Sequence, residues 1–315
     1  MSSNTMNKRL YPFELNGRYG YHDEDGHVVI SPQYDYAYDF SDNLAGVGLS
    51  GTYGYIDGKG NIFIPCIYDE VGMFYKGTAC VFVPTGYGVI DRSGRFMIPP
   101  MYESASSFHE GISLVSLRGK FGFVNEQNRF VIPPIYEDAS GFDSAGWACV
   151  ALRGAYRYIN RSGETVLEMN DFDEANPFHE NLAIVRRGAQ YMYVDRNGNP
   201  LLNTAYDDAI GSSEGFLGVK KHGKWGFVNL GGDLVSDMKY DEISPFHHGM
   251  AAVCILKKWG VIDSLGKEIL PCRYEAVRIY STTMLWIFLA DAGGCYIRPT
   301  GEVIRPRNAR GQTIR

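Results

Sequence analysis

Carboxylates recur at one register of this sequence, each directly after an aromatic residue. The acids are Asp35, Asp69, Glu103, Glu137, Asp173, Asp207, Asp241 and Glu275. A row of carboxylates could bind cations or a basic partner, or each acid could accept backbone N–H bonds at a turn or a helix start. An acid present in every copy indicates a requirement of folding more than a localised site, so we favour the second role.

Three histidines also share one register, because each directly follows a phenylalanine. They are His109, His179 and His247, which are 70 and 68 residues apart. Imidazole is a common metal ligand, but a metal site requires its ligands to converge. Positions so far apart do not converge in a linear array and would meet in a closed ring only at its axis. We therefore predict no metal site and keep these histidines as candidates for partner binding.

The four tryptophans are possible binding anchors, because exposed aromatic rings stack on sugars or fill pockets of a partner. Trp225 and Trp259 occupy a position that recurs along the chain, so we expect them to be buried as part of the fold. Trp147 and Trp286 lie outside that position. These two are therefore the tryptophans that we propose for partner binding.

The remaining reactive residues do not form a known catalytic or cofactor motif. The segment His22-Asp23-Glu24-Asp25-Gly26 weakly resembles a calcium loop, but it lies on a turn of the kind that other copies also have. The sequence contains no Gly-x-Ser-x-Gly, phosphate-binding loop or His-Glu-x-x-His motif. Its 6 cysteines include no Cys-x-x-Cys pair and are expected to be buried thiols. We predict no catalytic residue, no cofactor and no metal.

These residues lie within a repeat whose period is 34 or 35 residues. Each copy contains an aromatic residue, then glycine, an aromatic residue or valine, an aliphatic residue, and Asp or Asn. The glycines of this motif are Gly20, Gly54, Gly88, Gly122, Gly226 and Gly260. Arg157 and Met192 replace the glycine in two central copies, which we expect to pack differently. A recurring motif of this kind is typical of a stacked array of small structural units.

The rest of each copy predicts three short antiparallel strands. A turn such as Asp57-Gly58-Lys59-Gly60 closes the first hairpin, and a short apolar strand that often ends in proline follows it. A linker then carries the aromatic–acid pair and, six residues after the aromatic, a second aromatic residue that is usually Phe; Ser212 is the exception. The third strand leads into the next motif. Stacked copies would bury the aromatic residues in a continuous ladder.

The motif resembles that of a known family. Gly223-Lys224-Trp225-Gly226-Phe227-Val228-Asn229 and Lys258-Trp259-Gly260-Val261-Ile262-Asp263 are similar to the signature of the WG-repeat, or KWG-repeat, family of bacterial proteins. The resemblance extends from about Tyr11 to Ile304. It implies a repeat scaffold with a binding role, and it supplies no catalytic residues.

Composition and length are consistent with one all-β array. We predict eight full repeats and a partial ninth over residues 1–304, followed by a basic tail over residues 305–315. A propeller-like, toroidal arrangement is favoured, although a propeller blade usually has four strands. The alternative is an open β-superhelix, but the terminal copies lack the polar caps expected of an open solenoid.

Charge and hydropathy narrow the range of partners. The net charge is −6, although the tail carries Arg305, Arg307, Arg310 and Arg315, so the remainder is more acidic still. An acidic body does not favour nucleic acid or an anionic membrane. We expect the tail to be frayed. No signal peptide or membrane-spanning run is evident, so a soluble, cytoplasmic protein is expected.

The expected function is a non-enzymatic scaffold that binds a protein partner. The alternatives are a lectin-like, glycan-binding repeat protein and an enzyme whose site has no known motif. Because the recurring residues are assigned to folding, function is expected where the copies differ. Those differences are at Arg157, Met192, Ser212, the histidines of alternate copies, and the arginine-rich tail.

Overall fold

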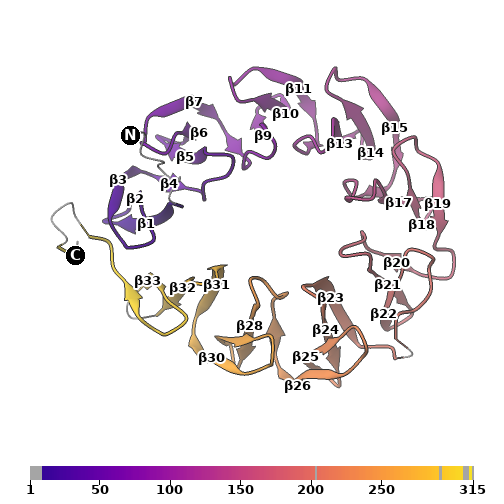
Figure 1. The fold of residues 1–315 in the computed structure, drawn as a ribbon. Helices are drawn as coiled ribbons and strands as arrows, with labels where there is room; N and C mark the ends of the chain where they lie inside the picture. The colour runs from indigo at the N-terminus through magenta and orange to yellow at the C-terminus, as the bar shows by residue number, and fades with distance from the viewer. Residues whose placement is uncertain (1–8, 203, 291–292, 308–311, 314–315) are drawn as a thin grey trace, which may run out of the picture. The chain divides into compact units, whose positions relative to one another are not determined.

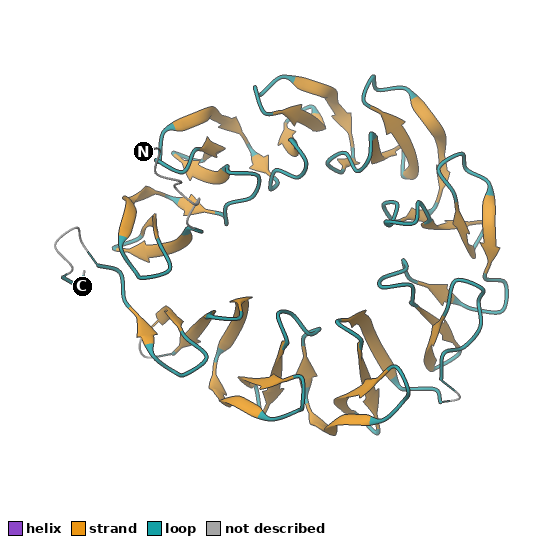
Figure 2. Cartoon of the chain, viewed as in Figure 1, coloured by secondary structure: helices purple, strands orange, loops and turns teal. Residues whose placement is uncertain are grey.

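The computed structural model describes residues 9–202, 204–290, 293–307 and 312–313. Within these ranges the chain consists of strands and loops, without a helix (Figure 2). This part of the chain accordingly offers no helix of the length and apolar character that crossing a membrane requires. The prediction of an all-β tandem repeat is confirmed.

The chain forms two compact units, of which the first comprises Met1–Gly141 together with Arg305–Arg315. Its sheets are antiparallel and follow the order of the chain (Figure 1). Its strands are β1 (Tyr11–Leu15), β2 (Arg18–His22) and β3 (Val28–Tyr34); β4 (Tyr36–Ala37), β5 (Ala45–Leu49), β6 (Thr52–Ile56) and β7 (Ile62–Tyr68); β8 (Glu70–Val71), β9 (Thr78–Val83), β10 (Gly86–Asp91) and β11 (Phe96–Tyr102); β12 (Ser104–Ala105), β13 (Ile112–Leu117), β14 (Lys120–Asn125) and β15 (Phe130–Tyr136); and β16 (Asp138–Ala139).

The second unit comprises Phe142–Ile304 and repeats the same plan. Its strands are β17 (Ala148–Leu152), β18 (Ala155–Ile159) and β19 (Thr165–Glu168); β20 (Glu174–Ala175), β21 (Ala183–Arg187) and β22 (Gln190–Val194); β23 (Asp208–Ser213), β24 (Phe216–Lys221), β25 (Lys224–Asn229) and β26 (Leu234–Tyr240); β27 (Glu242–Ile243), β28 (Met250–Ile255), β29 (Lys258–Asp263) and β30 (Glu268–Tyr274); and β31 (Ala276–Ser281), β32 (Met284–Leu289), β33 (Gly293–Ile297) and β34 (Val303–Ile304).

Most sheets have a fourth strand in the segment that the sequence presents as a linker. In the third sheet, Glu70 and Val71 of β8 pair with Phe82 and Val81 of β9. The backbone N–H of Gly72 donates to the carbonyl of Cys80 at 2.8 Å and extends the ladder. Three strands were predicted because a strand of two residues is too short to show alternation in the sequence.

A glycine sets the register between the third and fourth strands of a regular sheet, such as β6 and β7. Tyr53 pairs with Tyr68 and Tyr55 with Ile64, so β7 has two more residues than β6 between these pairs. The extra residues bring the β7 backbone against Gly54. A Cβ at Gly54 would lie 2.5 Å from the carbonyl oxygen of Ile64, a distance that real side chains do not tolerate. A Cβ would also meet a backbone atom at less than 3.0 Å at Gly20, Gly88, Gly122, Gly226 and Gly260.

The two copies without this glycine do pack differently. Arg157 pairs with Glu168 and Tyr158 with Leu167, in step, and β19 has 4 residues where β7 has 7. In the copy with Met192, the described chain after β22 pairs through isolated bridges, Val194 with Pro200 and Tyr191 with Tyr206. A side chain at the glycine position therefore prevents the long outer strand from bulging over it.

The hydrophobic core lies between successive sheets. One cluster combines Tyr55, Ile64 and Tyr68 of the second sheet with Val81 and Ile90 of the third. Buried tyrosines extend across this boundary and donate their hydroxyl groups to backbone carbonyls about half a repeat further along the chain. These bonds join Tyr21 to Tyr38, Tyr55 to Gly72, Tyr158 to Asn176 and Tyr193 to Ile210. The predicted aromatic packing is confirmed for these sheets, each of which is covered in part by the next.

The C-terminal tail is partly ordered, contrary to the prediction of a frayed end. Arg307 forms a parallel bridge with His27 at the edge of the first sheet. Its N–H donates to the Gly26 carbonyl at 2.6 Å, and its carbonyl accepts the N–H of Val28 at 2.9 Å. These backbone bonds do not depend on side-chain type, so the sequence gives no sign of them. Arg310 and Arg315 lie outside the described residues.

The close approach of the β7 backbone to Gly54 leads to a prediction about stability. Replacement of Gly54 by alanine forces the β7 backbone away, so we expect Gly54→Ala to lower the free energy of unfolding by about 1–3 kcal/mol. Gly58 is the matched control in the same repeat, because a Cβ there meets nothing within 4 Å. Chemical denaturation of both variants measures the difference. Equal stability of the two variants would show that the close approach is not a constraint.

Candidate functional site

Several of the repeated acids bind the turn of the hairpin that follows them. The Asp241 carboxylate accepts the backbone N–H of Leu256 at 2.7 Å and the ammonium group of Lys224. The Lys224 bond is the main cause that lowers the pKa of Asp241. Further carboxylates that accept an N–H from the following hairpin turn include those of Asp35, Glu103, Asp173 and Asp207. The turn-capping interpretation is confirmed for these acids.

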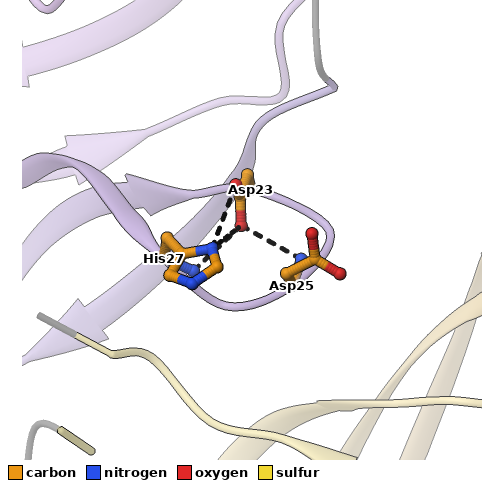
Figure 3. A group of neighbouring side chains, drawn as sticks. All are labelled: Asp23, Asp25 and His27. Carbon is orange, nitrogen blue, oxygen red and sulfur yellow. Dashed lines mark hydrogen bonds and ion pairs between the residues drawn. The ribbon is translucent and has the colours of Figure 1, made fainter. Parts of the chain in front are cut away.

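The cluster of Asp23, Asp25 and His27 has potential ligand atoms within 4.8 Å of one another (Figure 3). Its geometry is that of an ordinary turn. Asp23 Oδ1 accepts the backbone N–H groups of Asp25 at 3.0 Å and His27 at 2.9 Å. Asp57 Oδ1 accepts the N–H groups of Lys59 and Asn61 in the same way, each at 2.9 Å. Hydrogen bonding within the turn therefore explains the cluster, as predicted from the sequence.

A cavity of about 460 Å³ lies in the second unit, among the segments that precede the third strand of successive repeats. Ser212 lines it, at the position where neighbouring copies carry Phe178 and Phe246. Both phenylalanines are buried, and the much smaller Ser212 is 3% exposed. The copy that departs from the pattern therefore has a smaller side chain where the cavity lies.

Two of the three predicted histidines line this cavity. His179 precedes Ser212 by one repeat and His247 follows it by one repeat. His179 Nδ1 lies 2.6 Å from the Ser212 carbonyl oxygen, which makes Nδ1 the donor. The Ser212 hydroxyl donates in return to the His179 carbonyl at 2.8 Å. Alternate repeats thus contribute to one pocket, whereas we expected positions so far apart not to converge in a linear array.

The other lining residues give the cavity an apolar wall and a cationic edge. Pro245, Phe246, Ala252, Val277 and Ile279 supply the apolar groups, and Gly211, Ser213, Ser244 and Arg278 complete the lining. Ser213 donates its hydroxyl to the Phe246 carbonyl at 2.6 Å. Arg278 is exposed on β31, and its Nη1 lies 3.4 Å from the Tyr280 hydroxyl. Sequence inspection singled out Ser212 and the histidines but not Arg278, whose position carries no recurring signal.

The third histidine, His109, lies in the first unit. Its ring stacks on Tyr75, with 5.9 Å between centroids and an interplanar angle of 11°. The residue is half-buried. His109 therefore belongs to a separate contact between two loops of the first unit, and it does not line the cavity.

The tryptophans lie at half-buried positions and pack on neighbouring side chains. The Arg196 guanidinium lies over Trp147, 5.0 Å from the ring centroid, and pairs with Asp143 at 2.7 Å. Trp286 stacks on Phe288 with centroids 6.1 Å apart. Trp225 and Trp259 are also half-buried, although we expected them to be buried. Trp147, which Arg196 covers, is a weaker candidate for partner binding than the cavity residues.

All six cysteines are thiols rather than disulfides, as expected. Cys149 and Cys254 are buried and the others are half-buried. Burial raises the pKa of the Cys80 thiol to about 11, so it remains protonated at neutral pH. A protonated thiol is a poor nucleophile, which is consistent with a packing role.

The repeat pattern matches a known family model over most of the chain. The model describes a WG containing repeat and matches residues 19–52, 53–83, 87–121, 121–154, 156–190, 191–225, 225–259 and 259–281. The chain belongs to the WG-repeat family. No curated protein matches this WG-repeat chain significantly.

Several solved structures share the fold of this WG-repeat protein at low sequence identity. A eukaryotic initiation factor aligns at 10% identity with a TM-score of 0.66, over 94% of this chain and 95% of that chain. BamB from Moraxella catarrhalis aligns at 12% identity with a TM-score of 0.50, over 92% of this chain and 94% of that chain. The dihydro-heme d1 dehydrogenase NirN aligns at 10% identity with a TM-score of 0.51, over 97% of this chain and 74% of that chain. With nine small antiparallel sheets in the described chain, the predicted propeller-like fold class is confirmed.

The turn acids generate a second prediction. Asp91 accepts a hydrogen bond from the Ser93 hydroxyl and backbone N–H bonds from Ser93 and Arg95, and the hydroxyl bond is the main cause that lowers its pKa. We expect Asp91→Ala to cost about 1–2 kcal/mol of unfolding free energy at pH 7. Asp91→Asn is the matched control, because Asn160 makes the equivalent turn bonds with its Oδ1.

Acidification distinguishes the charge of the Asp91 carboxylate from its hydrogen bonds to the turn. Its folded pKa lies below the unfolded value of about 3.9, so its stabilisation is present above that value and is lost as pH falls through the folded pKa. Asp91→Asn is expected to lose less stability than the native chain between about pH 5 and pH 2. Thermal unfolding across this range measures the effect. Parallel pH profiles for the two proteins would contradict it.

Proposed function

We propose that this WG-repeat protein is a non-enzymatic scaffold that binds a protein partner through the cavity around Ser212. The observation that carries the proposal is the location of that cavity. The repeated acids and turn residues described above are engaged in folding contacts, and the cavity lies where one copy departs from the pattern. Sites of this kind on repeat scaffolds arise where individual copies vary.

The hydrogen bonds of the cavity favour binding over catalysis. A nucleophilic serine requires its hydroxyl to lie against a general base. The Ser212 hydroxyl instead donates to the backbone carbonyl of His179, and the His179 imidazole is bonded to the backbone carbonyl of Ser212. Ser213 is likewise bonded to the carbonyl of Phe246. These bonds direct both hydroxyl groups toward backbone carbonyls, so neither serine hydroxyl is bonded to a side chain that could act as its general base.

The lining also favours a protein segment over a sugar. A sugar site commonly presents exposed aromatic faces for stacking. The apolar wall here is mainly aliphatic, with Phe246 as its aromatic residue, and the predicted tryptophan candidates lie elsewhere in the sequence. The volume of about 460 Å³ falls within the range typical of pockets that take a compact group, about 300–1,000 Å³. A side chain or short segment of a partner fits this description.

Partner recovery from cells of the native host tests the proposal. Gly211 lines the cavity, and a Cβ there meets nothing within 4 Å, so Gly211→Leu places a bulky side chain at the cavity lining without a backbone clash. Gly141→Leu is the matched control, because Gly141 has the same repeat position and similarly open surroundings. We expect one protein to be recovered with the native chain and with Gly141→Leu, and to be lost with Gly211→Leu.

Reconstitution with the purified partner completes this test. Calorimetry should show that Gly211→Leu weakens binding by tenfold or more, since filling the pocket removes about 1.4 kcal/mol or more of contact energy. Recovery that is insensitive to Gly211→Leu would contradict the proposal. A glycan array with signals that depend on Gly211 would support the lectin-like alternative instead, and substrate turnover lost on the same substitution would indicate an enzyme.

A further inference from the structure

We infer that two copies of this chain associate through an apolar stripe on the outer strands of the first unit, with a two-fold axis that sets these strands antiparallel. The three outer strands β7, β11 and β15 follow one another along the first unit (Figure 1). Each contributes two exposed apolar side chains to the stripe, which consists of Phe63, Ile67, Phe96, Met101, Phe130 and Ile135. The inference concerns a surface other than the cavity around Ser212 and does not depend on the proposed function.

The stripe is continuous from each of these sheets to the next. The ring of Phe96 on β11 meets the ring of Tyr68 at the end of β7, with 6.4 Å between centroids. The ring of Phe130 on β15 meets the ring of Tyr102 at the end of β11 at the same distance. Each of these tyrosines directly follows an exposed side chain of the stripe. The exposed groups of neighbouring strands therefore form one surface.

The fold does not require an apolar residue along this surface. In two strands of the second unit a cation occupies the position of Ile67, namely Lys239 in β26 and Arg273 in β30. Each cation lies over the ring of the tyrosine that follows it, 5.4 and 5.1 Å from the centroid. Both strands have the length of β7 and bury the same two positions. Exposed apolar groups that folding does not require are typical of an interaction surface.

The area of the stripe is sufficient for a dimer. Its six side chains are between 38% and 64% exposed. A large side chain has about 150–250 Å² to bury, so a half-exposed one presents roughly 100 Å². The exposed neighbours Ile62 and Val131 bring the surface to about 800 Å², the area that each partner contributes to a standard interface. The largest apolar patch of a typical monomer is smaller, about 300–600 Å².

The outer strands favour an apolar surface as the partner over an added strand. Proline lacks the N–H that a pairing strand would need, and each outer strand contains proline near its middle: Pro65, Pro99, Pro100, Pro133 and Pro134. The partner must therefore contact side chains. No residue of β7, β11 or β15 is charged, so the stripe meets a copy of itself without opposing like charges. A second copy supplies an apolar surface of matching size.

Charged residues at the strand ends favour the two-fold arrangement. Arg129 directly precedes β15 and Asp69 directly follows β7, and both side chains are exposed. Neither forms an ion pair with another residue in the part of the chain that the structure describes. A two-fold axis through the middle of β11 places β15 of each copy on β7 of the other, with the strands reversed. Arg129 of each copy then lies opposite Asp69 of the other.

Sedimentation velocity of the full-length protein tests the association. We expect the native chain to be mainly monomeric at about 1 µM and mainly dimeric at about 100 µM. Met101→Lys places two like charges near the axis, so the dissociation constant should rise about a hundredfold or more. Leu265→Lys is the matched control, because it adds the same charge at an exposed turn position where another copy carries Lys59. It should leave the dimer intact.

The folding of both variants is checked by thermal unfolding. Met101→Lys introduces the residue type that Lys239 supplies at the same position, over a tyrosine ring. Its unfolding midpoint at low protein concentration should therefore match that of Leu265→Lys. Loss of the dimer in a folded Met101→Lys chain then reports on the interface.

Exchange of the charges at the strand ends tests the orientation. Arg129→Glu alone and Asp69→Lys alone should each weaken association about tenfold, because each brings like charges together at both ends of the interface. The double variant restores opposite charges at each contact. Its dissociation constant should return to within about threefold of the native value.

Each remaining outcome overturns the inference. A native chain that stays monomeric at about 100 µM does so, as does a dimer that is insensitive to Met101→Lys. A dimer that the double variant fails to recover has a different arrangement. A monomer that floats with phosphatidylcholine vesicles, or that recovers a host protein, and loses this property on Met101→Lys would assign the stripe to a lipid surface or to another protein.

Discussion

The passage of the outer strand over a glycine is the constraint on which each regular repeat depends. Gly54 has no Cβ, so the Ile64 carbonyl of β7 can occupy the space where a Cβ would lie. Strand β7 can therefore bulge over Gly54 while its Tyr68 still pairs with Tyr53. Tyr68 then packs in the core with the following sheet. The absence of one side-chain carbon therefore sets the position of an aromatic residue four places further along the partner strand.

Several repeats are also incomplete without the repeat that follows them. Buried tyrosine hydroxyls and exposed carboxylates both take their hydrogen-bonding partners from the next part of the chain, as Tyr55 does from Gly72 and Asp241 from Leu256. The tyrosine bond lies in the core, where an unmet hydroxyl is costly, and the carboxylate bond lies at the surface, where water competes. The core bond thus fixes the stacking, and the surface bond positions the following turn.

Local sequence predicts what depends on neighbouring residues and misses what depends on other repeats. The Asp-x-x-Gly turns, the long strands and the altered pairing at Arg157 follow from the properties of single residues, and the structure has each of them. The two-residue strand at Glu70 depends on the free edge of β9, and the pairing of Arg307 depends on a backbone edge nearly 280 residues earlier. Ser212 marked the position of the cavity in the sequence, but the shape of the cavity and the presence of Arg278 in its lining could be known only from the fold.

The bonds between Arg307 and the first sheet impose an order on biogenesis. The ribosome makes β1 to β3 well before Arg307, so the edge of that sheet gains its backbone partners at Gly26 and Val28 only after residue 307 has emerged. During translation this edge remains open to other strands, which is a state prone to mispairing. The first unit is thus completed only after the strands of the second unit have been made, and a stop codon shortly before Arg307 would leave the edge of β3 without these bonds.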